Sequence, residues 1–159
     1  MINRIINWWI GRQFKPIPNI KFTGDFFDLT FSSNWIFRKR RSGEYEFAIP
    51  EEINGVLQIG ALFSEKNNHN GFDINEVLEK TINLENKTAK IIKLGDYEAV
   101  YYKQLIKKNS IFDYRWYIRH ENIFLVITFN QEKDQELEVI EKELKQIKHL
   151  IEGIKIKNA

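Results

Sequence analysis

The stretch from Phe112 to Asn130, FDYRWYIRHENIFLVITFN, constrains the fold more than any other part of this sequence. It predicts two antiparallel strands joined at Glu121-Asn122, because apolar residues alternate with other types on both sides of that turn. If His120 pairs with Ile123, one face is nearly all apolar, with Tyr114 opposite Phe129, Trp116 opposite Ile127 and Ile118 opposite Leu125. The other face has Arg115 opposite Thr128, Tyr117 opposite Val126 and Arg119 opposite Phe124. We therefore expect the first face beneath the C-terminal helix and the second against solvent or a binding partner.

The other segments predict a mixed fold in which strands outnumber helices. Apolar alternation and turn residues indicate strands at residues 26–31, 35–39, 45–49, 56–63, 90–94 and 99–106. Asp73 and Glu76 have the spacing of a capping box, which predicts a helix through about Leu84. Apolar residues at steps of three and four predict an amphipathic helix from about Lys133 to Glu152. The expected fold class is α+β: an antiparallel β-sheet meander covered by helices (an α/β/α sandwich), with the C-terminal amphipathic helix on one sheet face.

The chain divides into residues 1–25, an N-terminal amphipathic segment and linker, and residues 26–159, a single domain. The first residues, MINRIINWWIG, lack a long apolar stretch and a small-residue cleavage site, which argues against a signal peptide. They predict a short helix, and docking of that helix onto the domain is the favoured interpretation. Contact with a membrane surface or a partner through Trp8 and Trp9 is the alternative.

Composition excludes several classes of function. Cysteine is absent, which removes disulfides, thiolate metal sites and cysteine nucleophiles, and fits a cytoplasmic location. Residues 1–47 hold eight Lys/Arg against four Asp/Glu, but the net charge of the chain is only +2. That asymmetry is too small to indicate nucleic acid as a partner. No apolar run has the length of a membrane-spanning helix.

The reactive residue types do not form a recognisable catalytic or metal-binding motif. His69, His120 and His149 are too far apart in sequence to match a metal-binding motif such as HExxH. No serine lies in GxSxG, and no glycine-rich phosphate loop is present. Glu44 and Glu46 would share one face of a strand, where a solvated strand edge is favoured over a general acid/base pair. We therefore expect no enzyme activity, no cofactor and no metal.

Two groups of cations are candidates for binding a protein. The run Arg38-Lys39-Arg40-Arg41 sits at a hairpin tip, where charge keeps the edge soluble and unpaired. Its alternative role is docking an acidic protein surface, and nucleic acid is a weaker alternative because phosphate binding needs a broader basic surface. The second group lies on the mixed face of the hairpin at residues 112–130. Either the first predicted helix covers this face, or the face forms a groove for a binding partner. The candidate partner-binding residues are Arg38, Arg40, Arg41, Arg115, Tyr117 and Arg119.

The order of segments resembles a known family. The strings DLTFSSNWIFRKR, YEFAI, NGVLQIGALF, AKIIKLGDYEAVYYKQ and DYRWYIRHENIFLVITFN, followed by EVIEKELKQIKHLIEGIKI, are similar to the PsbP-like fold over about residues 26–156. That α/β/α sandwich is shared by photosystem II extrinsic proteins, a Ran-binding nuclear import factor and many small bacterial proteins. The resemblance implies adaptors, chaperones of secreted effectors or subunits that bind another protein. It implies no active-site residues, because no catalytic motif defines the superfamily.

The combined interpretation is a soluble, non-enzymatic protein-binding domain. Within that class, we expect a bacterial immunity protein or a chaperone that binds a cognate toxin or secreted effector. The first alternative is a peripheral membrane or envelope-associated accessory protein anchored by the N-terminal WW segment. A second alternative is a small-molecule hydrolase that uses carboxylates.

Overall fold

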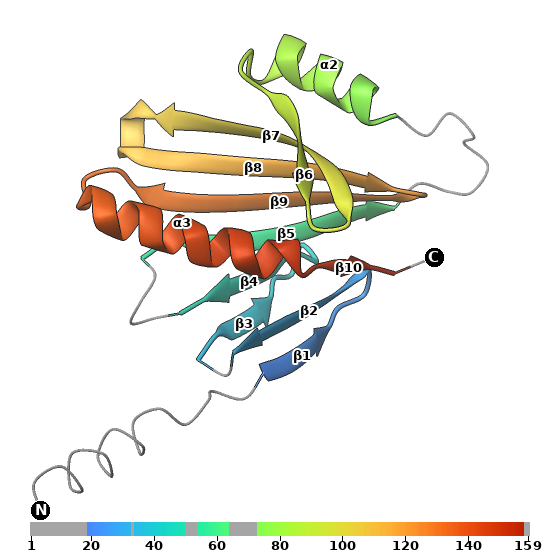
Figure 1. The fold of residues 1–159 in the computed structure, drawn as a ribbon, viewed down its shortest axis with the longest axis horizontal. Helices are drawn as coiled ribbons and strands as arrows, with labels where there is room; N and C mark the ends of the chain where they lie inside the picture. Colours follow the sequence, from blue (N-terminus) through green and yellow to red (C-terminus); the bar gives the residue numbers. More distant parts are fainter. Residues whose placement is uncertain (1–18, 33, 50–53, 64–72, 158–159) are drawn as a thin grey trace, which may run out of the picture.

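The computed structural model describes residues 19–32, 34–49, 54–63 and 73–157, which form two antiparallel sheets and two α-helices (Figure 1). The strands and helices in chain order are β1 (Asn19–Thr23), β2 (Phe27–Ser32), β3 (Ile36–Lys39), β4 (Tyr45–Ala48), β5 (Val56–Phe63), α2 (Ile74–Leu84), β6 (Lys90–Leu94), β7 (Tyr97–Ile106), β8 (Ile111–His120), β9 (Ile123–Glu132), α3 (Leu137–Glu152) and β10 (Lys155–Ile156). The expected α+β class is confirmed. The Trp8-Trp9 segment and the loop that carries His69 lie outside the described residues.

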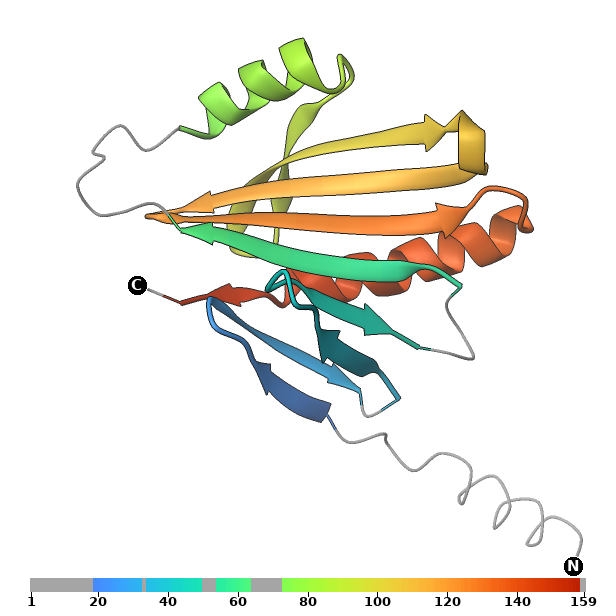
Figure 2. The same ribbon diagram turned by 180° about the vertical axis from the view of Figure 1, so that it is seen from behind.

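A seven-stranded sheet, in the order β3-β4-β5-β9-β8-β7-β6, forms the centre of the molecule. Its β8–β9 hairpin has the register predicted from the sequence, with His120 opposite Ile123 and Trp116 opposite Ile127. Strand β5 pairs with β9 along its whole length, so two segments far apart in the sequence are joined at the middle of the sheet. The smaller sheet, in the order β1-β2-β10, lies next to the β3–β4 end (Figure 2).

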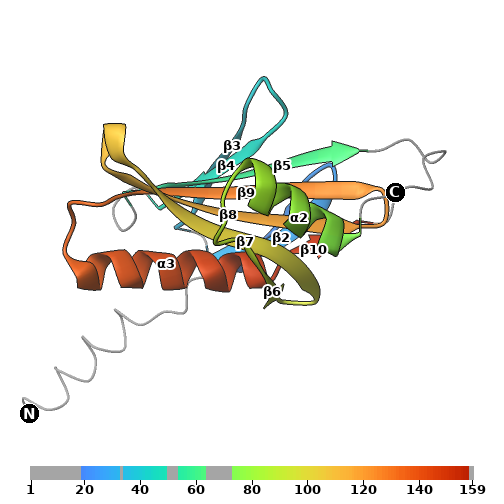
Figure 3. The same cartoon turned by 90° about the horizontal axis from the view of Figure 1, so that it is seen from above.

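The main core lies between the large sheet, helix α3 and the small sheet. The predicted core positions of the hairpin are all buried: Tyr114, Trp116, Ile118, Leu125, Ile127 and Phe129. Helix α3 contributes Ile147, Leu150 and Ile151 to the same cluster, so its apolar side packs on this sheet face as expected. Figure 3 shows α3 along one side of the sheet. Burial of matching apolar surfaces is the main stabilising term of such a layer.

Helix α2 packs on the opposite face of the large sheet. Its buried residues Val77 and Thr81 meet a second cluster that contains Val100, Tyr102 and Tyr117. Its main contacts are with β6, β7 and β8, so α2 sits at that end of the sheet (Figures 1 and 2). We call the sheet face opposite α3 the open face, because no helix of the described chain covers its β3–β4–β5 part.

Four details differ from the sequence prediction. Strand β1 lies within the stretch assigned to the N-terminal segment and linker, and it pairs with β2. It escaped prediction because its five residues, NIKFT, hold only two alternating apolar side chains, Ile20 and Phe22, directly after the prolines of the connector. Strand β10 is too short to give a pattern, and α3 begins at Leu137 rather than near Lys133. Asp73 occupies the N-cap position of α2, but its side chain makes no capping hydrogen bond.

Candidate functional site

The open face brings the two predicted cation groups onto one surface. In an antiparallel sheet, directly paired residues project to the same side. The register therefore places six side chains in one row across six strands: Tyr102, Arg115, Thr128, Gln58, Glu46 and Arg38. Arg38 and Arg115 were predicted as members of separate groups, and they are members of the same row.

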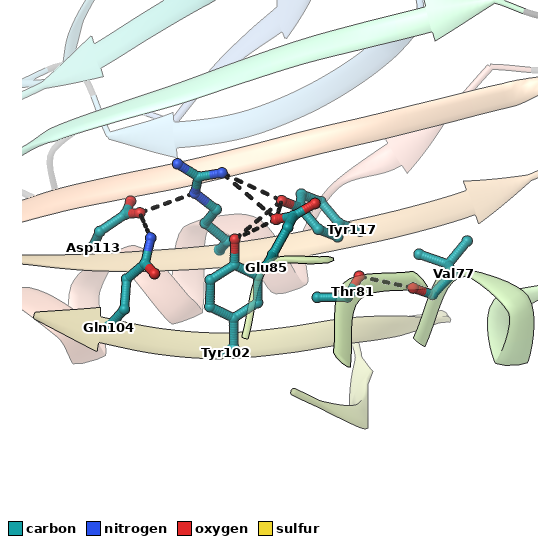
Figure 4. A network of polar contacts seen from close by, with 8 residues as sticks. Val77, Thr81, Glu85, Tyr102, Gln104, Asp113 and Tyr117 are labelled. Carbon is teal, nitrogen blue, oxygen red and sulfur yellow. Dashed lines mark hydrogen bonds and ion pairs between the residues drawn. The ribbon is translucent and has the colours of Figure 1, made fainter. Parts of the chain in front are cut away.

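At the α2 end of this row, Glu85 joins the helix to the sheet (Figure 4). Its Oε2 accepts hydrogen bonds from the hydroxyls of Tyr102 and Tyr117. The two hydroxyls lie 3.2 Å apart, and Nη1 of Arg115 lies 3.7 Å from the same carboxylate oxygen. We call Glu85, Tyr102, Arg115 and Tyr117 the tyrosine network. Because Glu85 follows directly on the last residue of α2, the network fixes the C-terminal end of that helix on the open face.

A buried carboxylate holds Arg115 from its other side. Nε of Arg115 donates to Oδ2 of Asp113 at 2.9 Å, and Nε2 of Gln104 donates to the same oxygen at 2.8 Å. Burial lowers the pKa of Arg115, but the hydrogen bond with Tyr117 and the charge of Asp113 outweigh burial, so the net pKa is raised. Arg115 is thus a fixed, permanently charged group.

The electrostatics of the two tyrosines disfavour acid–base chemistry near neutral pH. Burial is the largest cause that raises the pKa of Tyr102 and of Tyr117, and the hydrogen bond to the Glu85 carboxylate raises both further. Both hydroxyls therefore stay protonated at neutral pH, and they serve as hydrogen-bond donors. Within the described ranges, no three His, Asp or Glu side chains gather as a possible metal site.

At the opposite end of the row, Glu46 binds the cations of the β3–β4 hairpin. Arg38 donates through Nε to Glu46, Nη1 of Arg40 lies 3.5 Å from its Oε1, and Nε2 of Gln58 donates to Oε1 at 3.0 Å. The hydrogen bond from Arg38 is the largest cause that holds the pKa of Glu46 below its usual range. Arg41 lies exposed in the turn beyond.

A groove of about 490 Å³ runs between α2 and the open face, next to the tyrosine network. Its sheet side is formed by Leu62, Tyr117, Arg119, Phe124 and Val126, and its helix side includes Leu84. Leu62 is 64% exposed and Leu84 is 81% exposed. The volume lies within the range of roughly 300–1,000 Å³ that is typical of small-molecule pockets.

Comparison with known proteins places this chain in a family. Residues 19–159 match the family model described as "Domain of unknown function (DUF3805)". The chain belongs to the DUF3805 family. No curated protein matches this DUF3805 chain in sequence. No helix in the described part of the domain is long and apolar enough to cross a membrane.

Solved structures show that the DUF3805 domain has a PsbP-like fold. A crystal structure from Bacteroides thetaiotaomicron VPI-5482 is similar with a TM-score of 0.66 and 17% identity, over 88% of this chain and 48% of that one. This chain thus spans about half the length of that protein. The solution structure of cyanobacterial PsbP (CyanoP) from Synechocystis sp. PCC 6803 is similar with a TM-score of 0.57 and 11% identity, over 91% and 95% of the chains. LpqN of Mycobacterium tuberculosis, described as involved in cell envelope biogenesis, gives a TM-score of 0.48 and 14% identity, over 92% and 94%. The predicted PsbP-like resemblance is confirmed at the level of fold.

The candidate residues predicted from the DUF3805 sequence fall into three environments. Tyr117 and Arg119 line the groove, and Arg115 lies in the tyrosine network beside it. Arg38 and Arg40 bind Glu46 at the far end of the open face, and Arg41 lies in the turn beyond them. Sequence reasoning missed Glu85 and Tyr102. Pairing β7 with β8 would have placed Tyr102 opposite Arg115, but nothing in the sequence places Glu85 there.

Proposed function

We propose that this DUF3805 domain is a non-enzymatic protein-binding domain that docks a protein partner on its open face. Within that class, the proposal is a bacterial immunity protein or chaperone, located in the cytoplasm, whose partner is a cognate toxin or secreted effector. One observation carries the proposal: arginines and exposed apolar side chains share a sheet face that α2 covers only over β6, β7 and β8, where Tyr102 and Tyr117 are buried beneath it. Arg and Tyr are enriched among the residues that dominate protein interfaces.

Two arginines of the open face, Arg115 and Arg38, are held in place by carboxylates of the same domain before any partner arrives. Arg115 is held by Asp113 and Glu85, and Arg38 is held by Glu46. Immobilising a long side chain at an interface costs roughly 0.5–1.5 kcal/mol, so side chains that are already fixed reduce the cost of association. The exposed Leu62 and Leu84 lie beside the tyrosine network and supply apolar area for the centre of an interface.

The chemistry of the face favours binding over catalysis. Tyr102 and Tyr117 have raised pKa values and donate to a carboxylate, which makes them poor bases and poor nucleophiles. Arg115 and Asp113 neutralise each other. These groups provide shape and hydrogen bonds but no proton-transfer pair, which supports a binding role over the carboxylate hydrolase alternative.

The partner expected from this surface is an acidic or amphipathic protein rather than nucleic acid. Arg38, Arg40 and Arg115 already contact carboxylates of the same domain, so the face does not present the continuous positive surface that phosphate backbones require. A protein partner can instead offer a few carboxylates together with apolar anchors, which matches the mixture on the open face.

Charge reversal on each part of the open face tests the proposal. Arg119→Glu and Arg41→Glu change the groove and the hairpin turn, and Lys142→Glu on the exposed side of α3 is the matched control. Binding is measured against the product of the neighbouring gene, with folding checked by circular dichroism. We expect a loss of about 2 kcal/mol or more for a central arginine and much less at the rim. If both open-face variants bind like wild type at low and physiological salt, the docking surface is wrongly assigned.

Two further measurements distinguish an immunity protein from a membrane-anchored accessory protein. Co-expression of the domain with a toxic neighbouring gene product should restore growth if the domain is an immunity protein. Liposome co-sedimentation of the full chain and of a variant with Trp8→Ser and Trp9→Ser tests the membrane-anchored alternative. Binding to liposomes that depends on both tryptophans, together with no protein partner, would favour that alternative over docking.

A further inference from the structure

The groove has an apolar floor with a single cation at one end of its sheet side. The register places Arg119, Phe124 and Leu62 in one cross-strand row, and Tyr117 and Val126 in the neighbouring row. Gly60, opposite Val126, adds no side chain to the second row. Leu84 lines the groove from α2. An elongated apolar body could therefore lie against Phe124, Val126 and Leu62 with one end at Arg119.

The charged side chains that line the groove differ in their hydrogen bonds and ion pairs within the domain. Three charged side chains line it: Lys80, Glu85 and Arg119. Glu85 accepts hydrogen bonds from Tyr102 and Tyr117 through the same oxygen that lies beside the Arg115 guanidinium, so its carboxylate is already engaged within the tyrosine network. Arg119 is partly buried, and it forms no ion pair or hydrogen bond through its side chain in the part of the chain that the structure describes. A partly buried guanidinium without a counter-charge favours an anion placed next to it.

We propose that the groove binds a small amphiphilic carboxylate, with its carboxylate on Arg119 and its apolar body between α2 and the open face. The planar guanidinium presents two parallel N–H donors that match the two oxygens of a carboxylate. The body covers Leu62 and Leu84, whose side chains are largely exposed in the unliganded groove.

The apolar body and the carboxylate of the ligand should each contribute a measurable part of the affinity. Burying one further CH₂ group of the ligand contributes about 0.8 kcal/mol, so each added methylene should tighten binding roughly fourfold until the groove is full. A hydrogen bond to a charged group contributes roughly 1.5–3 kcal/mol, so loss of the guanidinium should weaken binding by about tenfold or more. The change of affinity with chain length measures the contribution of the apolar floor. The loss of affinity on removal of the guanidinium measures the contribution of Arg119.

Titration with saturated fatty carboxylates tests both statements. Octanoate, decanoate and dodecanoate, each below its micelle-forming concentration, are titrated into the full chain by calorimetry. Methyl NMR signals of Leu62, Leu84 and Val126 report whether the ligand occupies the groove. Arg119→Gln keeps much of the side-chain volume and removes the charge. Arg41→Gln, an exposed arginine in the hairpin turn, is the matched control.

The expected result is groove-specific binding that tightens with chain length, falls about tenfold or more in Arg119→Gln and is unchanged in Arg41→Gln. Dodecyltrimethylammonium has the same chain and the opposite charge, and it should bind much more weakly than dodecanoate. Leu62→Asp places a negative charge on the groove floor at a largely exposed position, and it should also weaken dodecanoate binding. The proposal is overturned if dodecanoate leaves the groove signals unshifted, if Arg119→Gln binds it like wild type, or if the cationic amphiphile binds equally well.

Discussion

Replacing Trp116 by alanine tests the packing of the main core between the large sheet and α3. Trp116 lies in β8 opposite Ile127 and is 0% exposed. Its ring centroid is 5.4 Å from that of Tyr101 and 6.3 Å from that of Tyr114, with which it is stacked. The alanine side chain would leave a void beneath α3 that these rigid neighbours in paired strands cannot close.

The expected cost follows from complete burial. Replacing a fully buried tryptophan by alanine lowers the free energy of unfolding by roughly 3–5 kcal/mol. For a chain of this size, 1 kcal/mol shifts the melting temperature by roughly 2–4 °C, so we expect a decrease of roughly 6–20 °C. Trp116→Phe should cost clearly less, because it keeps a ring in the stack. It also removes the indole Nε1, which has no hydrogen-bond partner in this structure.

Urea unfolding followed by circular dichroism measures the effect. The midpoint should fall in Trp116→Ala while the slope of free energy against urea stays constant, which would show that stability changed and compactness did not. Leu137→Ala, at a position 70% exposed in the first turn of α3, is the control and should stay within about 0.5 kcal/mol of wild type. An unchanged midpoint in Trp116→Ala would refute the assignment of this hairpin face to the core.

Three further predictions concern other parts of the chain. Gly95→Ala should destabilise the domain by more than about 1 kcal/mol in the same titration, because Gly95 has φ +59° and an added Cβ would lie 2.1 Å from the Glu152 carbonyl oxygen. Because folding lowers the pKa of Glu46 below 4.5, its contribution to stability is complete above pH 4.5 and is lost as pH falls through the folded pKa. Arg38→Gln should reduce that loss in acid unfolding curves. Deletion of residues 1–15 should leave a cooperatively folded domain, and early melting of the truncated chain would show that this segment docks into the core.

The register of the β8–β9 hairpin could be predicted because its two faces differ so strongly. A shift of one residue would exchange Trp116 with Tyr117 and would expose the apolar set, so only one pairing satisfies burial. Strand β5 was predicted as an apolar run after a turn, and its bounds, Val56–Phe63, agree with that prediction. Local alternation is sufficient to predict the register of a strand where one face of the strand is buried and the strand that pairs with it is adjacent in sequence.

The arrangement of the open face could not be predicted in this way. The row from Arg38 to Arg115 depends on the pairing of β5 with β9, which joins Gln58 to Thr128 across a long stretch of sequence. The position of Glu85 depends on how α2 docks, and its hydrogen bonds with Tyr102 and Tyr117 follow from that tertiary contact. The sequence also does not reveal whether a cation already forms an ion pair with a carboxylate of the same domain, as Arg38 does with Glu46.

The pairing of these cations changes which of them can attract a partner. Arg38, Arg40 and Arg115 each lie within 4 Å of a carboxylate of the same domain, so a partner's acidic group must compete with that carboxylate. Arg41 and Arg119 form no ion pair within the described residues. Electrostatic steering depends on the net field, in which compensated pairs largely cancel. Neutralising Arg41 and Arg119 together should therefore slow association at low salt more than neutralising Arg38 and Arg40 does. The opposite order would mean that the internal pairs open when the partner approaches.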